Sequence, residues 1–110
     1  MALCRVLLLH DLPPPVRQHP LTVNGRRRYL DLAYPDVRVA MEYDGRRDHG
    51  PRQWGADAER EDELWSIGWV RLPAGRLDLV EPYASAYCDR VRAASARAGI
   101  ATTVCEAAAR

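Results

Sequence analysis

The hydrophobic and polar positions along the chain change period several times, and each change marks a new element. Residues 37–44 alternate with a period of two, which is typical of a half-buried strand, whereas Tyr83, Tyr87, Val91 and Ala94 recur at helical spacing. The whole pattern predicts, in order, a helix over 2–10, strands over 16–23, 26–34 and 37–44, a helix over 53–67, a strand over 69–72, and a helix that begins at Pro82 and ends at Gly99.

Turn signals separate these elements. Asn24-Gly25 tolerates the positive φ of a two-residue hairpin, and Pro35-Asp36 predicts a second turn, so the first three strands should be antiparallel. Gly68 followed by the apolar Trp69 is typical of a Schellman cap at the end of the second helix. The sequence therefore predicts an α/β domain in which a small mixed sheet with antiparallel hairpins is flanked by helices.

Carboxylates gather on the predicted strands. Glu42 and Asp44 are two residues apart and share a face. If Pro35-Asp36 is a two-residue turn, Asp31 lies opposite Ala40, on that same face. Three carboxylates at this range would repel one another and suit Mg²⁺ or Mn²⁺. The simpler interpretation is a solvated strand face that is salt-bridged by nearby arginines.

Composition narrows the chemistry. Sixteen basic and fifteen acidic residues give a formal charge of +1, which excludes a polybasic tail or a histone-like binder but leaves a local basic patch possible. The chain contains Arg and no Lys, which excludes any mechanism that needs a lysine amine. Arginines bind phosphate well. We expect several to surround the metal site, with charge compensation as their simpler role: Arg26, Arg27, Arg28, Arg46, Arg47 and Arg52.

The cysteines and the apolar run near Met1 indicate the cellular location, and the pattern of elements indicates the extent of the domain. Three widely spaced cysteines support neither a disulfide framework nor a zinc ribbon and favour a cytoplasmic location, and the apolar run near Met1 is too brief for a signal peptide or a membrane span. We expect one domain over residues 1–99 and a flexible tail over residues 100–110.

Three stretches of the sequence resemble a known family. They are residues 29–45 (YLDLAYPDVRVAMEYDG), the pattern Asp57-x-x-Arg60-x-x-x-Leu64, and Ile67-Gly68-Trp69-Val70-Arg71. Together they resemble the uncharacterised endonuclease domains (domain of unknown function 559) related to very-short-patch mismatch repair endonucleases. That group belongs to the restriction-endonuclease-like superfamily with P-D…(D/E)-x-K sites, and the resemblance implies that fold.

The resemblance also implies roles for individual residues. Asp31 takes the position of the central metal-binding aspartate, Glu42 that of the signature acid, and the Tyr43 carbonyl that of a further ligand. Asp44 stands where the signature lysine would be. His49 matches the general base of the mismatch endonucleases, although the closer family has its histidine one position earlier, at Asp48. An upstream DNA-binding region would precede such a domain.

We therefore expect a DNA endonuclease that depends on Mg²⁺ or Mn²⁺. Asp31, Glu42, Asp44 and His49 would be catalytic, the metal would bind Asp31, Glu42 and Tyr43, and DNA would contact Arg46, Arg47 and Arg60. One alternative is a catalytically lapsed nuclease fold that binds nucleic acid or a partner protein, which Asp48 and the absence of an acid in the first helix favour. Another is a structural fragment that is not stable alone.

Overall fold

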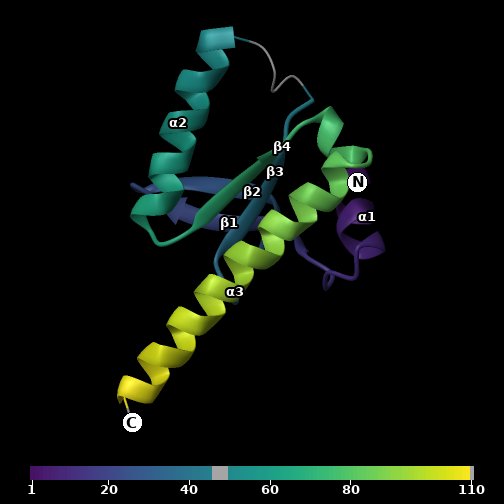
Figure 1. Cartoon of the computed structure of the whole chain (residues 1–110). Helices are drawn as coiled ribbons and strands as arrows, with labels where there is room; N and C mark the ends of the chain where they lie inside the picture. The colour runs from purple at the N-terminus through teal and green to yellow at the C-terminus, as the bar shows by residue number, and fades with distance from the viewer. Residues whose placement is uncertain (46–49, 110) are drawn as a thin grey trace.

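The chain folds into a four-stranded mixed sheet with helices on both faces (Figure 1). The computed structural model describes residues 1–45 and 50–109, and the side chains of 1–45 and 55–98. The elements follow in the order α1 (Ala2–Leu9), β1 (Val16–Val23), β2 (Arg26–Tyr34), β3 (Val39–Tyr43), α2 (Gly50–Ser66), β4 (Val70–Ala74), a 3₁₀ turn (Arg76–Leu79) and α3 (Tyr83–Ala109). The predicted α/β class and mixed sheet are confirmed.

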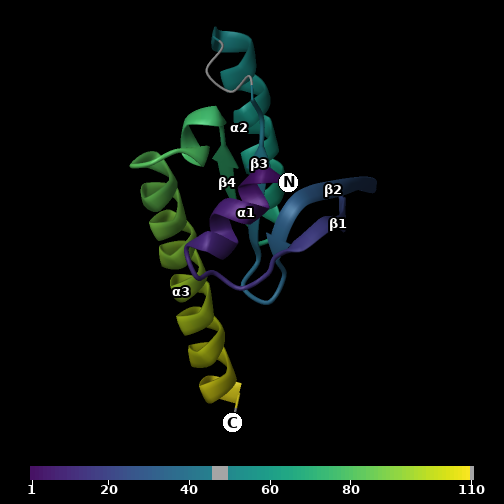
Figure 2. The ribbon, with the colours of Figure 1, turned by 90° about the vertical axis from the view of Figure 1, so that its right-hand side faces the viewer.

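The sheet has the strand order β1-β2-β3-β4. The first three strands are antiparallel, as the turn signals predicted, and β4 pairs with β3 in parallel through the α2 crossover. Asn24 (φ +52°) and Gly25 (φ +74°) close the first hairpin in the left-handed conformations that a two-residue turn requires. This hairpin extends to one side, away from α3 (Figure 2).

Two hydrophobic clusters fix the helices on the sheet. α1 and α3 cover one face, where Leu3, Leu7 and Tyr87 pack on Leu32 and Met41. α2 covers the other face through a smaller cluster of buried residues: Leu30, Ala33, Ala40, Leu64 and Trp69. The strand β3 therefore supplies side chains to both layers.

The Schellman cap at the end of α2 is confirmed. Gly68 has φ +82°, its amide donates to the Trp65 carbonyl at 3.0 Å, and the Trp69 amide donates to the Leu64 carbonyl at 2.9 Å. This cap turns the chain sharply from α2 into β4.

Several predicted boundaries are wrong: α2 begins at Gly50 rather than at Gln53, and β4 ends at Ala74 rather than at Leu72. The helix α3 continues past Gly99 to Ala109, because one glycine within a helix costs only about 1 kcal/mol. β3 begins at Val39 rather than at Val37, because residues 35–38 form a wider turn in which Arg38 is left-handed (φ +54°). The flexibility of residues 100–110 stays a prediction. In the part of the chain that the structure describes, no helix is long and apolar enough to cross a membrane.

Candidate functional site

Asp31 lies where two neighbouring strands separate. The pairing of β2 with β3 ends at Leu32 and Met41, and beyond it the Asp31 Oδ2 accepts a hydrogen bond from the Tyr43 amide at 3.0 Å. The carboxylate thus takes the place of the next hydrogen bond of the ladder. The backbone of Asp31 belongs to β2, and its side chain reaches across to the backbone of β3 at the point where the two strands separate.

A local irregularity in the β1–β2 pair accompanies this placement. Leu30 packs in the α2 cluster, whereas Leu32, two residues further, packs under α1 and α3. Regular alternation would put both on one face, so β2 changes face between them. Opposite this point, Gln18 of β1 has φ +50° and stands outside the register of paired residues. The intervening Asp31 side chain is thereby directed toward β3.

The predicted two-residue turn is wrong, and the convergence of Asp31, Glu42 and Asp44 stays a prediction. A two-residue turn would have set Asp31 opposite Ala40; instead Ala33 pairs with Ala40, and Tyr34 with Val39. The wider turn shifts the register by two residues, which preserves the face of every side chain. Asp31 lies close enough to Arg60, which binds Glu42, for its charge to help raise the pKa of that guanidinium.

Glu42 is held by two arginines from different elements. Arg60 of α2 donates from Nε to Oε1 at 3.1 Å and from Nη2 to Oε2 at 2.8 Å, and Arg71 of β4 donates from Nε to Oε1 at 2.8 Å. Arg71 Nη2 also lies 3.4 Å from Asp57 Oδ1. We call these four residues the Glu42 network. It links α2, β3 and β4 around a single carboxylate.

The network is largely removed from water. The side chains of Glu42, Arg60 and Arg71 are 13%, 19% and 9% exposed. Burial acts to raise the pKa of Glu42, but the hydrogen bonds and charges of Arg60 and Arg71 outweigh it and leave that pKa below its usual value. The hydrogen bond and the charge of Glu42 likewise raise the pKa of Arg60. Glu42 and Arg60 are therefore both ionised at neutral pH.

Other predicted site residues have different outcomes. The Asp44 amide donates to the Ala74 carbonyl at 2.9 Å, which extends the β3–β4 pairing by one residue. Arg46, Arg47 and His49, together with Asp48, lie outside the described residues, as does the side chain of Arg52. Their roles stay predictions.

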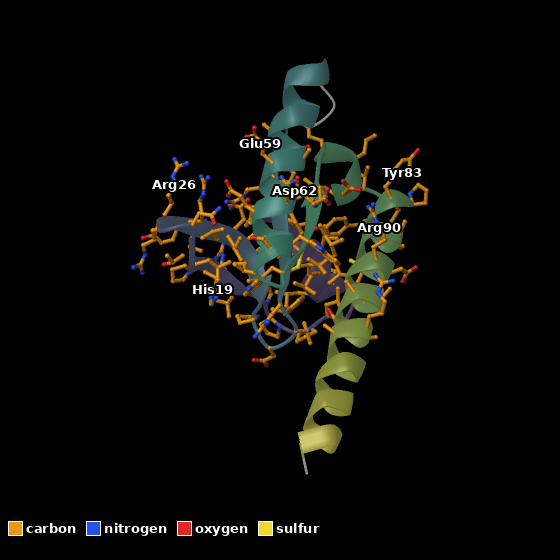
Figure 3. The ribbon with its side chains drawn as sticks, turned by 90° about the vertical axis from the view of Figure 1, so that its left-hand side faces the viewer. His19, Arg26, Glu59, Asp62, Tyr83 and Arg90 are labelled. Carbon is orange, nitrogen blue, oxygen red and sulfur yellow. The ribbon has the colours of Figure 1, made fainter. Side chains whose placement is uncertain are left out.

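The arginines of the first hairpin do not surround the carboxylates as expected. Arg28 instead donates to Glu63 of α2 at 3.0 Å, and Arg26 lies at the hairpin tip (Figure 3). The pairing of Arg71 with Glu42 was missed by the sequence reasoning. Its signal was an arginine inside the apolar segment Trp69–Leu72, where a charge requires a partner.

The donor atoms of the candidate site are of the kind that a divalent cation binds. Asp31, Glu42 and the Tyr43 carbonyl offer only oxygen, as Mg²⁺ prefers. Among the residues that the structure describes, however, no three His, Cys, Asp or Glu side chains form a group that could hold a metal. Glu42 already accepts three N–H groups, so a cation would share this carboxylate with two guanidinium groups.

Two proteins of Mycobacterium tuberculosis resemble part of this chain: uncharacterized protein MT2308 of strain CDC 1551 / Oshkosh and uncharacterized protein Rv2248 of strain ATCC 25618 / H37Rv. Each is 36% identical over 70 residues, which make up 62% of this chain and 26% of the relative. The chain thus spans about a quarter of the length of these curated relatives. No family model and no solved structure matches it.

Proposed function

We propose that this domain is a divalent-metal-dependent DNA endonuclease of restriction-endonuclease-like fold. The observation that carries the proposal is that Arg60 donates to Glu42 at 2.8 Å and has its pKa raised by Glu42 and also by the charge of Asp31, which lies where β2 and β3 separate. Two carboxylates at the end of a strand pair, next to a guanidinium group, combine ligands for a cation with a donor for phosphate.

The proposal gives a role to each residue of the candidate site. Asp31, Glu42 and the Tyr43 carbonyl would hold Mg²⁺ or Mn²⁺, which when bound polarises a phosphate oxygen and lowers the pKa of water. The depressed pKa of Glu42 keeps this carboxylate charged at neutral pH. Arg60 offsets the negative charge and is placed to donate to a phosphate that reaches Glu42. Asp44 or His49 would orient or deprotonate the attacking water.

The test is nicking of supercoiled DNA with Mg²⁺, with Mn²⁺ and with a chelator. Wild type should nick only with metal, and Asp31→Asn should lower the rate by roughly a hundredfold or more. Asp36→Asn is the matched control, because Asp36 is an exposed acid in the turn after the same strand. It should nick like wild type. Equal rates for the two variants, or no nicking above the chelator control, would refute the proposed activity.

A second candidate function is a nuclease fold that binds nucleic acid without cleaving it. The observation that favours it is the occupation of both Glu42 oxygens by Arg60 and Arg71, which leaves this carboxylate already neutralised. Wild-type protein would then retain DNA in a gel-shift assay and never nick it, with either metal.

A further inference from the structure

The part of the first hairpin that precedes Asp31 carries positive charge and no acid. From Leu12 to Leu30 the sequence contains no Asp or Glu, although the whole chain has fifteen. The same segment contains Arg17, Arg26, Arg27 and Arg28. Strands β1 and β2 bring these arginines together on a ribbon that extends beyond the helices (Figure 2).

The two faces of this ribbon differ. Residues paired across the strands share a face. The inner face packs against α2: His19 lies against the Trp69 ring with centroids 5.6 Å apart, and Arg28 binds Glu63. The opposite face carries the pairs Pro20–Tyr29 and Thr22–Arg27, all exposed. We call these four residues the outward face.

Packing does not account for the outward face. Tyr29 is 54% exposed, and the Arg27 guanidinium carbon lies 5.8 Å from the centroid of its ring. Among the side chains that the structure describes, no carboxylate forms an ion pair with Arg26 or Arg27. An exposed aromatic ring beside unpaired arginines combines a surface on which a base can stack with donors for phosphate.

We propose that the outward face binds a single-stranded or unpaired stretch of nucleic acid. A base would stack on Tyr29, and Arg27, with Arg17 at the margin, would contact phosphates. The inference rests on the proposed function for the class of ligand, and it places that ligand on a surface outside the candidate site.

The surroundings favour this face over its opposite. On the α2 side of the hairpin, a groove lined by Asn24 and Ser66 also contains Glu59, Asp62 and Glu63. Figure 3 shows Glu59 and Asp62 on α2, apart from Arg26 at the hairpin tip. Phosphates are repelled by these acids, which favours the outward face of the hairpin over the face that lines this groove.

The outward face lies near the candidate site along the chain but on the opposite face of the sheet. Tyr29 is two residues before Asp31 on β2, and its carbonyl accepts a hydrogen bond from Arg60 Nη2 at 3.5 Å. Because β2 changes face between Leu30 and Leu32, the Tyr29 side chain lies on the face away from α2, whereas Glu42 binds Arg60 of α2.

The experiment measures anisotropy of a labelled oligo-dT 20-mer and of a 20-bp duplex, in chelator so that no cleavage occurs. Tyr29→Leu keeps an apolar side chain and should weaken oligo-dT binding by roughly tenfold. Arg27→Ala should weaken it several-fold and lower the salt slope of log K by about one. Arg90→Ala is the matched control, since Arg90 is an exposed arginine over the Tyr87 ring on α3.

The inference is overturned if Arg90→Ala weakens binding as much as Arg27→Ala does, or if neither hairpin variant differs from wild type. It is also overturned if Tyr29→Leu affects only the duplex. Thermal melts of each variant verify that the fold is intact. Asp31→Asn in the same assay should bind like wild type, so a failure of the endonuclease proposal is seen in nicking and a failure of the hairpin proposal is seen in binding.

Discussion

Removal of the Glu42 charge should destabilise the protein strongly. Glu42→Gln keeps the shape of the side chain but leaves Arg60 and Arg71 facing an amide, with side chains only 19% and 9% exposed. Breaking a buried ion pair costs about 3–5 kcal/mol. One amide oxygen remains as acceptor, and Arg71 keeps Asp57 at 3.4 Å. We therefore expect a loss of about 3 kcal/mol, at the lower end of that range.

The assay is urea denaturation followed by far-UV circular dichroism at pH 7. Glu59→Gln is the control, because Glu59 is exposed on α2, and it should change stability by less than about 0.5 kcal/mol. The lowered pKa of Glu42 means that its contribution is present above the unfolded pKa near 4.5 and is lost as the pH falls through the folded pKa. The difference between Glu42→Gln and wild type should shrink accordingly in acid. A difference below about 1 kcal/mol at pH 7 would refute a desolvated network.

Two further predictions concern positions outside the network. His10 Nε2 lies 2.8 Å from Glu81 Oε1, and the pKa of His10 is raised by its hydrogen bond to the Val6 carbonyl and by Glu81. The stabilisation by the His10–Glu81 pair is full below the unfolded pKa of His10 near 6.5 and is lost as the pH rises through the folded pKa. The melting temperature should therefore fall over that pH interval, and His10→Asn should flatten this dependence on pH. An unchanged pH dependence in His10→Asn would contradict the pairing. Gly68→Ala should destabilise the protein by about 1 kcal/mol in urea titrations, because φ is +82° and the added Cβ lies 3.0 Å from Arg38 Nη1; a gain in stability would contradict the cap.

The regular parts of the fold were predictable because short-range signals determine them. Asn24-Gly25 sets the bounds of β1 and β2, and Gly68 ends α2 through hydrogen bonds within a few residues. The turn before β3 was not predictable in the same way. Arg38 has a positive φ, which residues other than glycine rarely adopt. An arginine at this position therefore does not indicate in the sequence that the turn has four residues rather than two.

The residues of the candidate site could be predicted from the sequence better than their arrangement in space. The alternation that placed Asp31 and Glu42 on one face survives a register shift of two residues. The change of face between Leu30 and Leu32 depends on which helix covers each side chain, and that is a long-range property. The partners of Glu42 come from α2 and β4, so their approach follows from the β3–α2–β4 crossover rather than from any local motif.

The strand order also determines how the sheet can meet other molecules. Its two border strands, β1 and β4, contain Pro20 and Pro73. The Val70 amide donates to the Arg38 carbonyl, at the start of β3. Because backbone N–H groups alternate in direction along a strand, the nitrogen of Pro73 faces away from β3, and proline has no N–H to offer there. A strand from another molecule that tried to extend the sheet would lack a donor at a proline on either border. Proline on both borders is a feature that disfavours edge-to-edge pairing of sheets.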